Sequence, residues 1–215
     1  MKSPTRQLIA AATLALLAGS ASAQASTGSL AGWTVLGDVV AQAGAIVLTT
    51  AYAEAGDPDQ PFNLSGNSAA DIALVEAAAG VPTYALDLPE PEYGREGSLV
   101  TQSFAVAAGD TLRFTWAFGT LETVFQDRAF AVINGQVLTL ATAGTPGGVA
   151  QGFEYSFAGA GTATLALGVI DTGDYLGVST LSVSNLSVTA VPEPATTALW
   201  LAGLGLVGCA ARRRR

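Results

Sequence analysis

Residues 111–118, which read TLRFTWAF, decide the fold class of this chain. Apolar side chains occupy every even position of this stretch, and Thr, Arg, Thr and Ala occupy the odd positions. Successive side chains of a β-strand point to opposite faces, so a period of two indicates a strand. One face is predicted to pack on a core and the other to meet water.

Similar alternation continues along the chain on both sides of this stretch. The pair Asn134-Gly135 predicts a type I′ hairpin, and a slip of the alternation at Ser184 and Asn185 predicts a bulge. About eight or nine short strands separated by turn residues predict an all-β fold, an antiparallel β-sandwich of the jelly-roll type. The apolar positions behind this prediction lie within residues 33–39, 46–52, 112–118, 130–138, 153–157, 165–169 and 181–188.

One short helix is expected to interrupt the strands. Ser68 is the predicted N-cap, Ile72 and Val75 repeat at helical spacing, and Gly80 ends the helix. Residues 89–97, which are rich in Pro and Glu, predict a loop.

Composition excludes several classes of chemistry. The 215 residues allow one domain or at most two. They contain no His, which excludes Ser-His-Asp and Cys-His catalysis and His-ligated zinc or haem. One Cys excludes an internal disulfide and a four-thiolate metal site.

The first 23 residues predict a cleaved secretory signal peptide. Lys2 and Arg6 give a positive start, and a short apolar run follows over residues 8–18. Ala21 and Ala23 form a small-x-small cleavage site, so signal peptidase is expected to leave Gln24 as the first residue. The apolar run is too short to serve as a membrane anchor, which needs about 20 residues.

A second apolar run covers residues 195–211 and is followed by Arg212, Arg213, Arg214 and Arg215. As a helix it would extend about 25 Å, at the short end of what crosses a hydrocarbon core of about 30 Å. Four guanidinium groups resist transfer across a membrane, so they are predicted to stop the chain with its body outside the cytoplasm.

Val191, Pro192, Glu193 and Pro194 stand directly before the apolar run, and the prolines favour a stiff, extended segment. With the apolar run and the Arg cluster, this segment resembles a PEP-CTERM sorting signal. The resemblance implies that an exosortase, a membrane transpeptidase-like enzyme, cuts near Pro-Glu-Pro and releases or transfers the protein. We therefore expect a signal peptide at 1–23, a secreted domain at 24–190 and a sorting signal at 191–215.

The secreted domain is strongly acidic once both ends are set aside. Residues 24–191 hold 3 basic residues, Arg95, Arg113 and Arg128, against 16 acidic ones, a net charge of −13. Nucleic-acid binding is excluded because phosphate contacts need Lys and Arg. Such a charge fits a soluble secreted protein or one that recruits divalent cations.

A calcium site is one interpretation of the acids. Ca²⁺ takes six to eight oxygen ligands, usually including loop carboxylates. Asp171 and Asp174 flank a Gly turn, and Asp38 lies in the first predicted strand, which in jelly rolls often neighbours the last. The alternative is that these are solvated turn acids, and no cofactor is required by the sequence.

Two further interpretations concern polysaccharides. The strand-rich body loosely resembles the β-sandwiches found ahead of PEP-CTERM tails and in carbohydrate-binding modules, on residues 103–112, 128–133 and 168–171. Tyr93 and Tyr175 lie in predicted loops and are the preferred sugar-stacking candidates. The wider aromatic set is Trp33, Tyr52, Tyr84, Tyr93, Trp116 and Tyr175. A glycosidase pair, Glu90 with Glu92 or Asp171 with Asp174, is the least favoured alternative because no framing motif accompanies it.

The sequence therefore predicts a non-enzymatic exported protein, bound to the inner membrane through its C-terminal helix until processing. Its expected destination is the cell surface or the extracellular space, with the exopolysaccharide or biofilm matrix implied by the resemblance. A carbohydrate-binding module on the same sandwich is the alternative.

Overall fold

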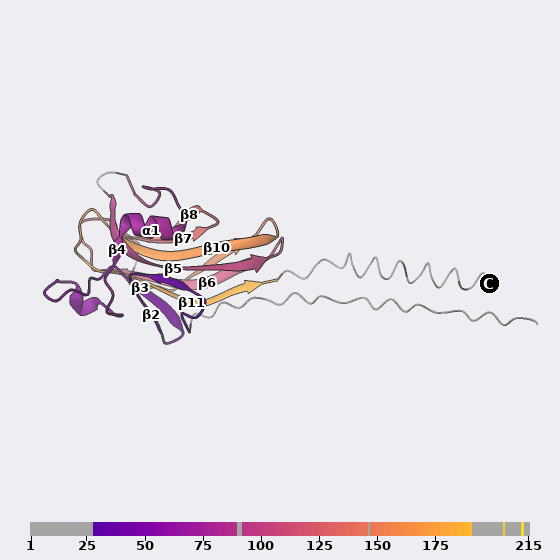
Figure 1. Ribbon diagram of the computed structural model, residues 1–215, viewed down its shortest axis with the longest axis horizontal. Helices are drawn as coiled ribbons and strands as arrows, with labels where there is room; N and C mark the ends of the chain where they lie inside the picture. The colour runs from indigo at the N-terminus through magenta and orange to yellow at the C-terminus, as the bar shows by residue number, and fades with distance from the viewer. Residues whose placement is uncertain (1–27, 90–91, 146, 191–203, 205–211, 213–215) are drawn as a thin grey trace, which may run out of the picture.

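Two antiparallel sheets stacked face to face form the protein in the computed structural model, which describes residues 28–89, 92–145, 147–190, 204 and 212 (Figure 1). One sheet, here sheet A, has the strand order β1-β5-β10-β7-β8, with β4 paired to β5. The other, sheet B, has the order β2-β3-β11-β6-β9. The predicted all-β sandwich with one short helix is confirmed.

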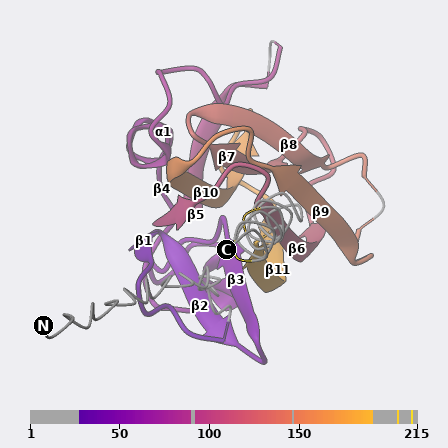
Figure 2. The same cartoon turned by 90° about the vertical axis from the view of Figure 1, so that its right-hand side faces the viewer.

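The strands have the following bounds: β1 Thr34–Leu36, β2 Asp38–Gln42, β3 Ala45–Thr49, β4 Ala70–Asp71, β5 Gly94–Val106, β6 Thr111–Thr120, β7 Arg128–Ile133, β8 Gln136–Thr142, β9 Gln151–Ser156, β10 Gly161–Thr172 and β11 Ser179–Thr189. The helix α1 covers Ile72–Ala79, and a 3-10 turn, η1, covers Gln60–Phe62. Figure 2 looks along the strands and shows α1 on the side of sheet A that faces away from sheet B.

The main core lies between the sheets and contains the residues that the alternation predicted. Leu112, Phe114, Trp116 and Phe118 of β6 are all buried there. A second cluster lies between α1 and the outer face of sheet A, where Val75 of α1 packs near the Phe130 and Ile170 side chains. The middle of sheet A is therefore buried on both faces, which explains why all six residues of β7 are buried.

Two local predictions are confirmed and three need correction. Asn134 and Gly135 both have positive φ, as a type I′ turn requires, and the register of β11 shifts after Ser184. The predicted first strand is instead divided at Gly37, which has a φ of 83°. Its two halves enter different sheets as β1 and β2, because the chain turns there from one layer to the other.

The helix begins later than predicted. Asp71, and not Ser68, is the N-cap, and its side chain accepts the Ala73 N–H at 2.8 Å. Ser68 instead donates its hydroxyl to Glu54 at 2.6 Å. Gly80 ends the helix with a φ of 72°, as expected. The predicted loop over residues 89–97 is too long, since β5 already begins at Gly94.

Several predicted features lie outside the described residues. They are the signal peptide at 1–23 with its cleavage site at Ala21, Ala23 and Gln24, the motif from Val191 to Pro194, the apolar run at 195–211 apart from Leu204, and Arg213 to Arg215. In the part of the chain that is described, no helix combines the length and the apolar character needed to span a membrane.

Close approach of β5 and β10 requires glycine at position 97. A Cβ at Gly97 would collide with the Val169 carbonyl oxygen and lie 3.0 Å from the Ile170 Cα, and neither backbone atom can move aside without disturbing the sheet. We expect Gly97→Ala to lower the free energy of unfolding by about 2 kcal/mol. Gly152→Ala in β9 is the matched control, because its Cβ would meet nothing within 4 Å. Urea unfolding of both variants measures this, and equal stability of the two would contradict it.

Candidate functional site

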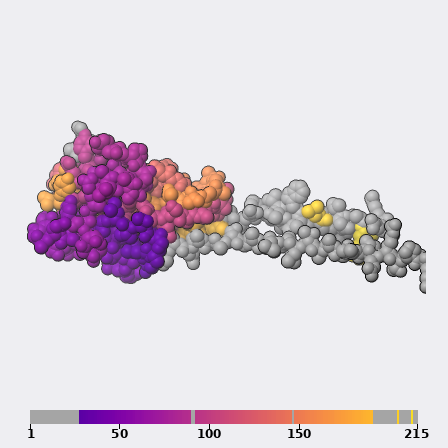
Figure 3. Space-filling model, viewed as in Figure 1, coloured from indigo at the N-terminus to yellow at the C-terminus, as the bar shows by residue number. Residues whose placement is uncertain are grey.

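A cleft of about 670 Å³ lies where α1, the turn after it and the start of β5 meet. Its walls come from three sequence segments that the fold brings together: Ile72, Ala73 and Glu76 of α1, Thr83, Tyr84 and Asp87 of the turn, and Tyr93, Gly94 and Arg95. In Figure 3 the magenta side chains of this part of the chain form the upper left surface of the molecule. The cleft is therefore open to solvent and combines aromatic, hydroxyl and charged groups.

Tyr84 stands out because its backbone is strained and its side chain is exposed. Its φ is 68°, a left-handed conformation that bulky residues rarely adopt. The turn that holds it is closed by the Ala85 N–H, which donates to the Pro82 carbonyl at 3.1 Å. The side chain is 76% exposed. Strained residues of this kind concentrate at functional sites, so Tyr84 marks this cleft as a candidate.

Tyr93 lines the same cleft, just before β5, and is 39% exposed. The next residue packs closely on α1, because a Cβ at Gly94 would lie 2.8 Å from the Ile72 side chain. The Gly94 N–H donates to the Asp87 carboxylate at 2.9 Å, which ties the start of β5 to the turn after α1. These contacts fix the separation between the segments that carry the two tyrosines.

Tyr175, the other predicted sugar-stacking residue, does not line this cleft. It lies in the loop between β10 and β11 and is 51% exposed. Tyr93 and Tyr84 therefore line one cleft, and Tyr175 lies outside it on the loop whose Gly173 N–H donates to the Tyr93 carbonyl at 2.8 Å. Tyr84 was only one of the wider aromatic set, and its one sequence signal is the position after Pro82 and Thr83 in a predicted turn.

The three predicted calcium ligands do not form one group. Asp38 of β2 is buried in sheet B and accepts the Thr49 hydroxyl and the Ser65 N–H, the latter at 2.7 Å. Asp171 ends β10 in sheet A, and Asp174 accepts the Leu176 N–H at 3.0 Å. No group of three or more Cys, Asp or Glu side chains among the described residues could hold a metal ion. Calcium binding at these positions stays a prediction.

Three buried carboxyl groups, those of Glu96, Asp127 and Asp171, gather near the start of β5 and the end of β10. Glu96 pairs with Asp171 across the two strands. Asp127 precedes β7, accepts the Thr172 N–H at 3.1 Å and the Ser179 hydroxyl at 2.6 Å, and so joins β10 to β11. The Glu96 carboxyl lies beside the Tyr52 hydroxyl, and Oδ1 of Asp171 is buried without a hydrogen-bond partner among the described residues.

Burial dominates the ionisation of this group. It raises the pKa of Glu96 to about 7, although the nearby Tyr52 hydroxyl opposes the rise. It also raises the pKa of Asp127 to about 7, against the hydrogen bonds from Ser179 and Thr172. For Asp171, burial and then the neighbouring charges of Asp127 and Glu96 raise the pKa to about 10. Asp171 is therefore protonated at neutral pH.

The carboxylate pairs considered for glycoside hydrolysis are used differently. Asp171 is only 1% exposed, which keeps it from a polysaccharide chain. Glu92 accepts the Thr172 hydroxyl at 3.0 Å and the Gln126 N–H at 2.8 Å, so its carboxylate ties loops together. Glu90 lies outside the described residues.

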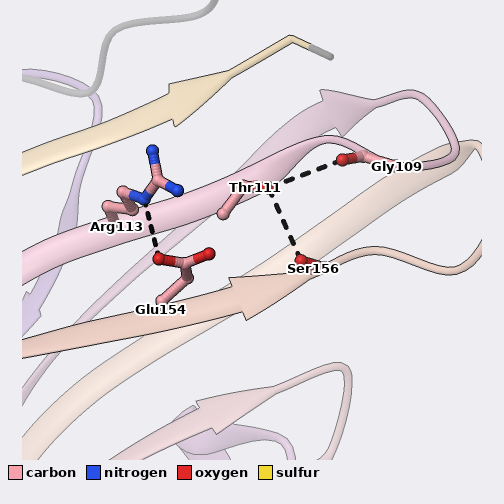
Figure 4. Close-up of polar contacts among 5 residues, drawn as sticks. All are labelled: Gly109, Thr111, Arg113, Glu154 and Ser156. Atoms are coloured by element: carbon pink, nitrogen blue, oxygen red, sulfur yellow. Dashed lines mark hydrogen bonds and ion pairs between the residues drawn. The ribbon is translucent and has the colours of Figure 1, made fainter.

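The outer face of sheet B carries a different kind of polar surface (Figure 4). Arg113 of β6 and Glu154 of β9 lie directly opposite each other, with Nε and Oε2 3.0 Å apart. Thr111 and Ser156 form the next cross-strand pair, with their hydroxyl oxygens 3.5 Å apart. Both partners of the ion pair are more than half exposed, so the pair contributes little to stability.

Comparison with known proteins identifies the C-terminal segment. Residues 190–215 match the PEP-CTERM protein-sorting motif, which confirms the motif predicted from Pro-Glu-Pro, the apolar run and the Arg cluster. Such a motif implies exosortase-dependent export and membrane anchoring at the C-terminus. No curated protein gives a significant sequence match to the chain.

Solved structures with a similar arrangement are distant in sequence. TmCBM61 in complex with beta-1,4-galactotriose is 11% identical, with a TM-score of 0.39, and the match covers 77% of this chain and 92% of that one. A CBM4 structure is 13% identical, with a TM-score of 0.36 and coverages of 75% and 96%. The N-terminal cellulose-binding domain of Cellulomonas fimi beta-1,4-glucanase C is 11% identical, with a TM-score of 0.34 and coverages of 78% and 93%.

The buried carboxyls predict a pH-dependent stability. Between the ordinary pKa of 4.5 and about 7, folded Glu96 holds a proton that the unfolded chain releases. The contribution of Glu96 to the free energy of unfolding is therefore fully present below pH 4.5 and is lost as the pH rises to about 7. We expect Glu96→Gln to flatten this part of the curve, measured by urea unfolding from pH 4.5 to 8.

The matched control is Glu154→Gln, because its carboxylate is exposed and Arg113 lowers its pKa. This variant should keep the wild-type slope between pH 4.5 and 7. If Glu96→Gln and Glu154→Gln give the same slope as the wild type, the buried carboxyl is ionised in the folded protein and the prediction fails.

Proposed function

We propose that this is a non-enzymatic extracellular or cell-surface protein that an exosortase-like enzyme processes through the C-terminal tail. One observation carries the proposal: β11 ends at Thr189, and the sorting motif begins at residue 190. A cut near Pro192 to Pro194 would therefore remove no strand of the sandwich. The predicted signal peptide and the acidic body support the same destination.

The position of β11 explains why processing has to occur outside the sandwich. β11 lies between β3 and β6 in sheet B, and it contributes Leu181, Val183, Leu186 and Val188 to the main core. A cut within β11 would therefore expose the apolar side chains that this strand contributes to the core. The Pro-rich segment after residue 190 gives an enzyme an extended substrate without disturbing the strand.

Intact mass of the mature protein tests this proposal. Expressed with an exosortase, the chain should begin at Gln24 and lack the apolar run and all four C-terminal arginines. Replacing Pro192, Glu193 and Pro194 with Ala should leave the full tail in place. The same replacement at Pro89, Glu90 and Pro91 repeats the tripeptide change in a segment without an apolar run after it, and processing should then be normal. A wild-type mature protein that retains Arg212 to Arg215 would overturn the proposal.

A second candidate function is carbohydrate binding by the sandwich, and the cleft between Tyr84 and Tyr93 favours it. Pyranose rings present C–H groups that stack on aromatic faces, and hydroxyl and charged groups then fix their orientation. The cleft offers two exposed tyrosines with Thr83, Asp87 and Arg95 beside them. Its volume of about 670 Å³ lies within the range of small-molecule sites.

If saccharides stack in this cleft, each of the two aromatic rings should contribute to the binding affinity. We expect Tyr84→Ala and Tyr93→Ala each to weaken binding about tenfold in affinity electrophoresis through polysaccharide gels. Tyr84→Phe keeps the ring and should bind normally. Tyr175→Ala is the matched control, since Tyr175 is similarly exposed but lies outside the cleft. Equal retardation of all four variants would place the saccharide elsewhere on the protein.

A further inference from the structure

Arg95 differs from the other two arginines of the acidic body because it lines the cleft and also takes part in no ion pair with another described residue. Arg113 is paired with Glu154 on sheet B. Arg128 is buried, and its Nη1 donates to the Leu86 carbonyl at 2.9 Å. Arg95 lines the cleft, and its Nε donates to the Gly173 carbonyl at 2.8 Å. Over the part of the chain that the structure describes, Arg95 takes part in no ion pair.

The carboxylates that share the cleft are already held by backbone donors. Asp87 accepts the Gly94 N–H at 2.9 Å, and buried Glu76 accepts the Leu86 N–H at 3.1 Å. Arg128 lies behind the same turn: burial lowers its pKa, and the charge of Asp87 opposes that effect. Among the described residues, Arg95 is therefore the one cationic group that lines the cleft, beside the carboxylates of Glu76 and Asp87, while the body as a whole carries a net charge of −13.

Arg95 matters because the protein as a whole repels polyanions. Long-range attraction cannot bring an acidic polymer to a body with so few cations, so any binding must come from short-range contacts. The guanidinium of an arginine is a fork of donors that matches the two oxygens of a carboxylate. Its Nε bond to Gly173 anchors Arg95 and leaves the terminal nitrogens without a carboxylate partner.

We propose that the cleft binds an acidic polysaccharide, with a uronate carboxylate on Arg95 and the sugar rings against Tyr84 and Tyr93. This inference rests on the carbohydrate-binding candidate and names the chemical class of its ligand. The guanidinium selects the charged group, and the aromatic rings supply contact area that is independent of charge. Neutral polymers of the same shape would use the rings but would leave Arg95 without its partner.

The experiment compares two forms of one polymer with the full mature protein. Polygalacturonate carries a carboxylate on every ring, and its methyl ester has the same backbone without the charge. Affinity electrophoresis should show retardation by polygalacturonate and at least tenfold weaker binding to the methyl ester. Arg95→Met, which keeps an unbranched apolar stem, should bind polygalacturonate at least tenfold more weakly, and Arg95→Lys should keep part of the affinity.

Arg113→Met is the matched control, because it removes an exposed arginine from the other sheet and should leave binding unchanged. Thermal unfolding of each variant separates lost binding from lost folding, and partial rescue by Arg95→Lys provides a second check. If both polymer forms bind equally, and only the tyrosine variants weaken binding, the acidic ligand class is wrong while carbohydrate binding stands. If neither form is retarded and alginate is not retarded either, the acidic-ligand inference is overturned. Retardation by a neutral polysaccharide alone would then still leave the carbohydrate-binding candidate in place.

Discussion

Burial of the middle of sheet A on both faces is the constraint on which the rest of the structure depends. The main core covers one face, and α1 with the turn after it covers the other. A strand in such a sheet has no wet side, so β7 is apolar or small at nearly every position. Where β5 and β10 come closest to their neighbours, only glycine fits: Gly97 abuts the β10 backbone, and a Cβ at Gly168 would lie 2.8 Å from Cε1 of the Phe130 ring. The same covering layer positions the cleft, because α1 provides its wall.

The loops at one end of the sandwich are held together mainly by carboxylates. Asp38 accepts N–H groups of residues 64 and 65, Glu92 links residues 126 and 172, and Asp127 links β10 to β11. In a body with three arginines, most acids have no cation to pair with, so backbone N–H groups and hydroxyls take that role. Burial shifts Glu96 and Asp171 towards the neutral form, although the Tyr52 hydroxyl favours the Glu96 carboxylate.

Sequence reasoning succeeded where one face of a strand meets water and failed where neither does. The alternation over residues 111–118, the Asn134-Gly135 turn and the bulge near Ser184 all depend on local rules, and the structure confirms them. β5 was assigned in part to a loop because Arg95 and Glu96 give no apolar pattern, although tertiary packing buries Glu96 completely. The site was only half found: Tyr93 follows from its loop position, whereas the prominence of Tyr84 depends on a left-handed backbone that no local pattern specifies.

The two proposed activities are compatible because the features that carry them lie at opposite ends of the sandwich. Gly94, at the start of β5, pairs with Thr172 at the end of β10, and this end holds the cleft and the connecting loops. β11 runs the other way and ends at Thr189, far from α1 in Figure 1. A chain anchored through residues 190–215 would therefore present the cleft away from the membrane, and cleavage of the tail would leave the residues of the cleft unchanged. Arg95 and Tyr84 could then bind a matrix polymer both before and after processing. The sorting motif would determine where the protein is placed, and the cleft would determine what it binds there.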